Sequence, residues 1–229
     1  MVAKKSKLAL LFHRIVSDPS AITFREDITF EKFEEIVRLV AEICPDITVT
    51  FDDGFESDWL FAAPCLQKKQ IHGIFFVVEN WLGTPGYLTP TQLEDLKHRG
   101  FSIGCHSKNH PDLMALQDPE LLEEVEFKSD GIYGTSFSIP FGRARIDTIT
   151  TAVAQGWSEI YVSSDANRLD SAYIIPRLNI TNTTPIWFLR FMLGRQSLAI
   201  IFLKLLGSIT FCMKSFLGLG CYERFRRYF

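Results

Sequence analysis

The chain has 229 residues, 47% of them hydrophobic and 22% charged, a composition that fits a globular protein with one domain of catalytic size. The net charge of −3 is unevenly distributed. Residues 186–229 hold seven Lys or Arg and one acid, a net +6, so residues 1–185 carry −9. The acidic body argues against nucleic acid as a partner, whereas the basic, apolar C-terminal segment suits an anionic membrane surface.

Short apolar runs recur along the chain and are predicted to be strands: residues 8–12, 47–51, 74–78, 101–103, 137–139, 160–162 and 173–175. Runs that are apolar throughout, without alternation, are typical of parallel strands buried on both faces. Helical patterns lie between them: residues 30–40, 90–100, 118–125 with Asp118 as the expected N-cap, and 152–156. This alternation predicts an α/β fold, either a barrel or a doubly wound sheet.

Two features of the sequence indicate the cellular compartment of the protein. The five cysteines form no Cys-x-x-Cys pair, which argues against a disulfide framework or a zinc ribbon. The apolar run at Leu8–Phe12 is shorter than the core of a signal peptide and no small-residue cleavage site follows it. We therefore expect a cytoplasmic protein, peripheral at the inner face of the membrane.

Functional side chains are expected where parallel strands end, because loops converge over that edge of a barrel or sheet. The residues that follow the predicted strands there are His13, Asp52, Asp53, His106, His110 and Pro140. Taken alone, Asp-Asp-Gly is often only a turn. The two histidines have helical spacing, but Pro111 disfavours helix at His110, so a loop is predicted.

In combination these segments resemble the polysaccharide deacetylase family, carbohydrate esterase family 4, over residues 8–180. Thr50–Gly54 is similar to the family motif T-F-D-D-G, and His106–Pro111 to its motif H-S/T-x-x-H-P. Looser similarity covers Leu11–Arg14, Phe137–Gly142 and Ile175–Arg177. The resemblance implies a distorted barrel of about seven parallel strands and a metal-dependent hydrolase that removes an N-acetyl group from an amino sugar.

The resemblance also assigns roles. It makes Asp53, His106 and His110 the ligands of one divalent ion, most often zinc, with cobalt, manganese, nickel or iron as alternatives, and makes Asp52 the general base. Two imidazoles and a carboxylate leave open positions on such an ion for water and an acyl oxygen. By the same analogy Ser107 braces the metal loop, and the Pro140-Phe141 turn holds the oxyanion through the Phe141 N–H.

Two departures from the family pattern change the expected assignments. Ser138 stands where many members have an Arg that pairs with the base, and Arg177 from the last strand is the candidate to replace it. No His follows His110, so His13 is the candidate general acid, the alternative being a histidine that only orients Asp52.

Aromatic residues Trp59, Trp81 and Tyr87 lie in or near the rim loops, and either sugar stacking or core packing would explain them.

The organisation is predicted as a catalytic domain at 1–184 and a helical, basic and apolar tail at 185–229. Uncharged stretches in the tail reach at most nine residues, which is too short to span a bilayer. Amphipathic helices lying in the membrane interface are expected, and the alternatives are a hairpin that closes the barrel or an oligomer contact. Expected partners are an N-acetylated sugar, an oligosaccharide or a lipid-linked glycan, without nucleic acid.

Three other functions fit the same residues. One is a deformylase acting on a lipid-linked formamido sugar. Another is a homologue that binds glycan without catalysis. The third is an iron oxygenase, because two His and a carboxylate also describe a facial triad.

Overall fold

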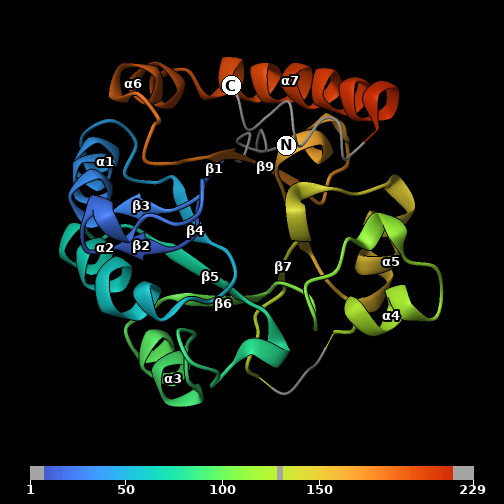
Figure 1. The fold of residues 1–229 in the computed structure, drawn as a ribbon, viewed down its shortest axis with the longest axis horizontal. Coiled ribbons are helices and arrows are strands. Elements are labelled where there is room, and N and C mark those ends of the chain that lie inside the picture. The colour runs from blue at the N-terminus through green and yellow to red at the C-terminus, as the bar shows by residue number, and fades with distance from the viewer. Residues whose placement is uncertain (1–7, 128–130, 219–229) are drawn as a thin grey trace, which may run out of the picture.

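The computed structural model describes residues 8–127 and 131–218, and Figure 1 shows their arrangement. The central feature is a closed barrel of seven parallel strands, in the order β1-β4-β5-β6-β7-β8-β9, in which β9 pairs with β1. The strands are β1 (Ala9–Phe12), β4 (Thr48–Phe51), β5 (Gly73–Val77), β6 (Ser102–Cys105), β7 (Ser136–Ser138), β8 (Glu159–Val162) and β9 (Ile174–Asn179). The predicted barrel class and the seven predicted strands are confirmed.

Helices surround this barrel (Figure 1). They are α1 (Phe30–Ile43), α2 (Ala63–Lys69), α3 (Pro90–His98), α4 (Glu120–Glu124), α5 (Ile146–Gln155), α6 (Ile186–Gly194) and α7 (Gln196–Leu217). The sequence did not reveal α2, or the short parallel pair β2 (Ile15–Val16) and β3 (Ile28–Thr29). The prediction of Asp118 as the N-cap of α4 is wrong, because the helix begins at Glu120 and Pro119 holds the cap position without a side-chain bond.

The strands place apolar side chains on both faces. Leu10, Phe12, Val49, Phe51 and Phe75 belong to the large cluster between the strands and the outer helices. A smaller cluster belongs to the opposite face of the strands: Ala9, Ile74, Phe76, Tyr161 and Ile175. Side chains alternate along a strand, so Asp52 lies on the same face as Thr50, and Arg177 on the same face as Ile175. This is the face of the smaller cluster. The sequence pattern thus places Asp52 and Arg177 at one end of an apolar barrel interior.

The interior is tightly filled. A Cβ added to Gly104 on β6 would lie 2.3 Å from the ring of Phe76 on the neighbouring strand. Glycine at this position therefore leaves the volume that the Phe76 ring occupies.

The C-terminal segment packs against the barrel. Helix α6 lies on α1 and buries Leu189, Met192 and Leu193, while α7 packs on η6 (Ser164–Arg168) and on β9. Contact between α7 and η6 is close: a Cβ on Gly207 would lie 2.9 Å from the Arg168 amide nitrogen. The predicted boundary after residue 184 stays a prediction, and what the structure adds is that α6 and α7 both contribute residues to the large apolar cluster between the strands and the outer helices.

Helix α7 differs from the expected tail in length. Lys204 interrupts the apolar run without ending the helix, so its 22 residues are long and apolar enough to cross a membrane by length and composition. The expectation that no tail element reaches that length is therefore wrong. The predicted tail charges Arg224, Arg226 and Arg227 lie outside the described residues.

The close contact of α7 yields a prediction about Gly207→Ala. In a helix, Ala is normally more stable than Gly by about 1 kcal/mol, but the new methyl group would meet backbone atoms of Arg168 and Ser164 that cannot move aside easily. We expect Gly207→Ala to lower the melting temperature by a few degrees in differential scanning calorimetry. Gly194→Ala is the matched control, since nothing lies within 4 Å of its added Cβ, and an equal change in both variants would contradict the close docking.

Candidate metal centre and catalytic pocket

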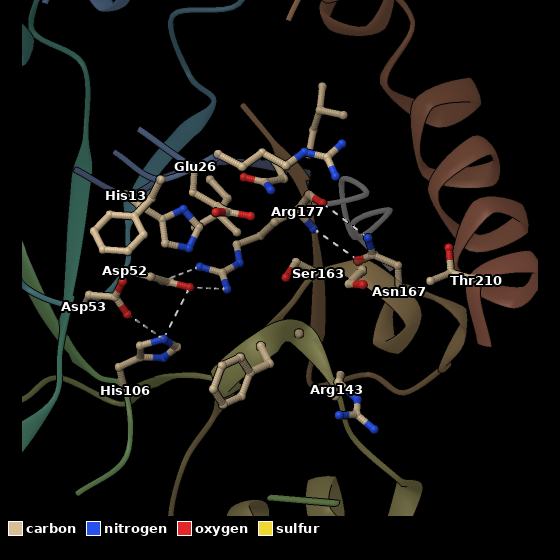
Figure 2. A pocket seen from close by; sticks show the side chains of 18 of the residues that line it. His13, Glu26, Asp52, Asp53, His106, Arg143, Ser163, Asn167, Arg177 and Thr210 are labelled. Atoms are coloured by element: carbon tan, nitrogen blue, oxygen red, sulfur yellow. Dashed lines mark hydrogen bonds and ion pairs between the residues drawn. The ribbon is translucent and has the colours of Figure 1, made fainter. Parts of the chain in front are cut away.

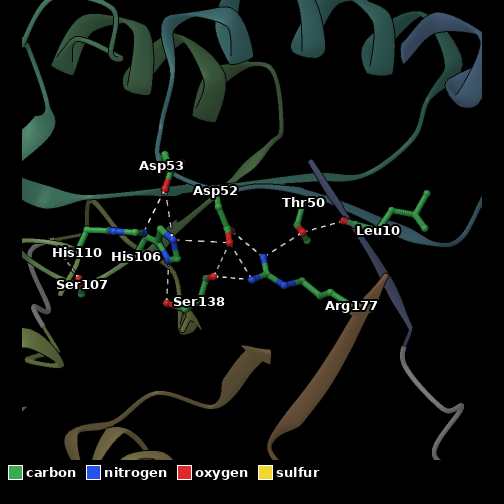
Figure 3. A network of polar contacts seen from close by, with 9 residues as sticks. All are labelled: Leu10, Thr50, Asp52, Asp53, His106, Ser107, His110, Ser138 and Arg177. Atoms are coloured by element: carbon green, nitrogen blue, oxygen red, sulfur yellow. Dashed lines mark hydrogen bonds and ion pairs between the residues drawn. The ribbon is translucent and has the colours of Figure 1, made fainter. Parts of the chain in front are cut away.

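The three predicted metal ligands converge at the carboxyl ends of β4 and β6 (Figure 3). One ligand atom from each of Asp53, His106 and His110 lies within 4.8 Å of the other two. The Oδ1 atom of Asp53 is 3.5 Å from Nε2 of His106 and 3.4 Å from Nε2 of His110. Side chains from two loops that are more than fifty residues apart in the chain thus face a common point.

Both histidine rings turn Nε2 toward Asp53. Nδ1 of His106 lies 2.9 Å from the carbonyl oxygen of Ser138, which can only accept, so Nδ1 donates and Nε2 is the nitrogen that faces the ligand cluster. Burial, followed by the neighbouring His106, lowers the pKa of His110 to about 4, although Asp53 and Asp52 oppose the shift. His110 is therefore neutral near pH 7.

The loop that carries these histidines is held in an unusual backbone conformation. Ser107 and His110 both have positive φ, 68° and 59°, and the Ser107 hydroxyl accepts a hydrogen bond of 2.9 Å from the His110 amide. Glu124 on α4 braces the loop from below, accepting bonds of 3.0 Å and 2.9 Å from the amides of Lys108 and Asn109. The sequence indicated the loop and Ser107, but it carried no signal for Glu124.

The donor set fits a divalent ion. Among the described residues no hydrogen-bond partner faces the buried Oδ1 of Asp53, which leaves this oxygen available for a cation. Two imidazoles and one carboxylate are ligands that zinc accepts, and burial without a partner would otherwise be costly for the carboxylate.

Asp52 forms the second feature of the site, a buried ion pair with Arg177 (Figure 3). The Arg177 guanidinium donates to both carboxylate oxygens, at 2.6 Å and 2.8 Å, and is fully buried. The Ser138 hydroxyl donates to Asp52 at 3.0 Å and accepts from Arg177 at 2.8 Å. Thr50 accepts a further bond from Arg177 at 3.3 Å. Arg177 thus occupies the place beside Asp52 for which the sequence made it the candidate.

The charge state of Asp52 follows from these partners. Burial would raise the pKa of this carboxyl group, but the positive charge of Arg177, the His106 ring and the hydrogen bonds together hold the pKa well below its usual range. Asp52 is therefore ionised near pH 7.

A cavity of about 1100 Å³ opens above the predicted metal ligands (Figure 2). His13 lies on its wall close to Asp52, and no described residue gives its buried Nδ1 a hydrogen-bond partner. Trp81 and Tyr87 also line the cavity, whereas Trp59 lies elsewhere and donates to Asp95 at 2.6 Å.

The turn expected to hold the oxyanion also faces the cavity. It is the short helix η5 (Pro140–Gly142), in which Pro140 is buried and Phe141 is 57% exposed. Phe141 has φ 57°, and its ring centre is 4.6 Å from that of His110. The first hydrogen bond of this turn runs from the Gly142 amide to the Ile139 carbonyl oxygen. The Phe141 N–H lies before that bond, in the part of a helical turn where donors are left free for a ligand.

Two features of the site were not indicated by the sequence. One wall of the cavity comes from α7, through Leu203, Leu206, Ile209, Thr210, Met213 and Lys214. The other feature is Asp58, which is fully buried and has no partner for either carboxyl oxygen among the described residues. Burial, and then the charges of Asp53 and Asp52, raise the pKa of Asp58 well above its usual value.

Comparison with known proteins agrees with this geometry. Residues 41–157, just over half of the chain, match the profile of the polysaccharide deacetylase family. Barrels of similar fold occur in the deacetylase PplD of Streptococcus pyogenes, solved with acetate (TM-score 0.67, 19% identity, 77% of this chain and 92% of that one), and in IcaB from Ammonifex degensii (TM-score 0.65, 21% identity, 83% and 97%). The chain belongs to the polysaccharide deacetylase family.

Two relatives in Bacillus subtilis share sequence similarity over part of their length. YxkH, named as a polysaccharide deacetylase, is 25% identical over 144 residues, which are 59% of this chain and 51% of YxkH. PdaA, a peptidoglycan-N-acetylmuramic acid deacetylase, is 27% identical over 88 residues, 38% of this chain and 32% of PdaA. The chain thus aligns with half of the first relative and a third of the second.

The convergence of three ligands predicts that each is needed for metal binding. We expect His110→Ala to lower the affinity for zinc at least about tenfold, because two ligands cannot replace three, while circular dichroism stays unchanged since the residue lies on a rim loop. Zinc content after dialysis measures the effect. His72→Ala is the control, because His72 is exposed and precedes β5, and retention of zinc by His110→Ala would refute the assignment.

The buried ion pair yields a second prediction. Removing the guanidinium in Arg177→Met leaves the Asp52 charge buried without its partner, so we expect the free energy of unfolding to fall by about 3–5 kcal/mol. Urea denaturation of metal-free protein measures it. The double variant Asp52→Asn with Arg177→Met should lose less than the sum of the two single changes, and strict additivity would mean that the two groups do not stabilise each other.

Proposed function

We propose that this protein is a metal-dependent carbohydrate N-deacetylase, which removes an acetyl group from an amino sugar of a surface glycan or of a glycan precursor. The observation that carries the proposal is the placement of the Asp53, His106 and His110 cluster beside an ionised Asp52 in one open cavity. Relatives named as deacetylases support it.

Asp53, His106 and His110 would hold the ion, most often zinc, which when bound polarises an acyl carbonyl and makes a nearby water more acidic. Asp52 takes the proton of the attacking water, and its bidentate bonds with Arg177 fix its position for that step. The N–H of Phe141 donates to the oxygen on which negative charge develops.

His13 is proposed to give a proton to the nitrogen as the carbon–nitrogen bond breaks, because it lies on the cavity wall close to Asp52 (Figure 2). Acetate and a free amine are then the products, and water supplies the oxygen of the new carboxylate. A formyl group would leave by the same steps, so a formamido sugar is the closest alternative substrate.

Two alternatives are less well supported by the residues. An iron oxygenase requires only the two histidines and one carboxylate, and the Asp52–Arg177 pair has no part in that chemistry. A glycan-binding protein without catalysis would not need a base held ionised beside the ligand cluster. Oxygen dependence and acetate release separate these functions.

We also propose peripheral membrane contact through the tail. The positive charges of the tail contribute less to this contact than the composition indicates. Arg190, Lys204 and Lys214 pair within the chain, with Glu42 at 3.2 Å, Asp170 at 3.1 Å and Asp165 at 2.7 Å. Apolar side chains rather than these cations would therefore supply the attraction.

The role of Asp52 is tested by Asp52→Asn, which keeps the shape of the side chain but accepts a proton poorly. We expect zinc content to persist while acetate release from N-acetylglucosamine oligomers falls by a factor of about 10² or more. Asp46→Asn on the exposed surface controls for the loss of one charge. Loss of zinc in Asp52→Asn would mean that Asp52, rather than Asp53, is the essential ligand.

A further inference from the structure

We propose that α7 is the hydrocarbon-binding wall of the active-site cavity, so that the sugar substrate is carried on an aliphatic chain and presented at a membrane surface. The inference rests on the proposed function, because it names the substrate class of the same cavity.

The position of α7 beside the site is fixed by three independent contacts with η6. Gly207 allows close backbone approach to Ser164 and Arg168. Lys214 forms a nearly buried ion pair with Asp165, and the Arg168 guanidinium lies 3.9 Å from the ring centre of Phe211. The face of α7 that meets the cavity is therefore a defined part of the site.

That face is apolar. Leu203, Leu206, Ile209 and Met213 line the same cavity as Asp53 and His106, and among the α7 residues on the wall only Thr210 and Lys214 carry a polar group. The Lys214 ammonium is already paired with Asp165. Sugar hydroxyl groups buried against such a wall would lose hydrogen bonds to water without replacement, whereas methylene groups would gain contact. An amphiphilic molecule matches both the polar side of the cavity, with Asp53 and His106, and the apolar wall on α7. A polymeric glycan does not match the apolar wall.

The apolar surface continues from the cavity to the outside. Leu206 and Ile209 both line the cavity and remain 46% and 57% exposed, which places them at its mouth. Beyond them the outer face of the helix exposes Leu198, Ile201, Phe202, Leu205 and Phe216. The helix contains no Asp or Glu. A protein partner seated on this face would cover the mouth of the cavity, whereas an aliphatic chain attached to the substrate would follow the surface from a membrane into the site.

The test uses methyl, octyl and dodecyl N-acetylglucosaminides below their micellar concentrations, with zinc-loaded full-length protein. Each methylene that becomes buried contributes up to about fourfold in binding, so we expect kcat/KM for acetate release to rise at least about tenfold from the methyl to the dodecyl compound. Calorimetric titration of the same compounds into Asp52→Asn measures chain binding without turnover.

Two double variants locate the effect. Leu206→Ser with Ile209→Ser, at the cavity mouth, should remove the dependence on chain length in both measurements. Leu198→Ser with Leu205→Ser, on the outer face and away from the cavity, should retain it. Equal loss in both pairs would mean adsorption to the outer face and would overturn the inference.

The outcomes also separate the two proposals. Acetate release that is equal for all three compounds overturns the hydrocarbon wall and leaves the deacetylase function intact. Binding to Asp52→Asn that rises with chain length, with no acetate released from any compound by the wild-type protein, supports the wall and overturns the deacetylase function.

Discussion

The buried ion pair between Asp52 and Arg177 is the constraint on which the rest of the site depends. Two charges in an apolar barrel are tolerated only with close geometry and further hydrogen bonds, here from Ser138 and Thr50. These four residues belong to or directly follow three different strands, so the pair requires β4, β7 and β9 in fixed register. It also holds Asp52 ionised beside the ligand cluster, which links the closure of the barrel to its chemistry.

Much of this arrangement follows from local sequence patterns. Continuous apolar runs indicated all seven barrel strands, and the rule that parallel strands present their carboxyl ends to the site selected Asp52, Asp53, His106 and His110. Ser138 stands where the resemblance placed an Arg beside the carboxylate, and Arg177 on the last strand was the candidate to replace it. His106 also forms a hydrogen bond with the backbone carbonyl oxygen of Ser138, and no side-chain pattern could indicate that contact.

The parts that could not be predicted depend on contacts between distant segments. Glu124 braces the metal loop from a helix of five residues, and nothing in its local sequence distinguishes it from its acidic neighbours. In α7, Lys204 and Lys214 looked like interruptions in an interfacial segment, but both pair with carboxylates brought close by the fold. Gly207, which the sequence did not single out, allows the close approach of α7 to η6. The role of each of these residues thus depends on a partner that is distant in the sequence.

The tail and the catalytic centre are connected through η6. Asn167 on this turn accepts from the Arg177 amide at 3.4 Å and donates to its carbonyl oxygen at 3.3 Å, on the strand that carries the guanidinium to Asp52. The same turn holds α7 through Asp165 and Arg168. A displacement of α7 would therefore reach Arg177, the partner of Asp52, through one short helical turn. Because α7 also forms a wall of the cavity, a molecule bound against that wall is linked to the ion pair through η6 and Asn167. Substrate binding and the positioning of Asp52 therefore share a common support.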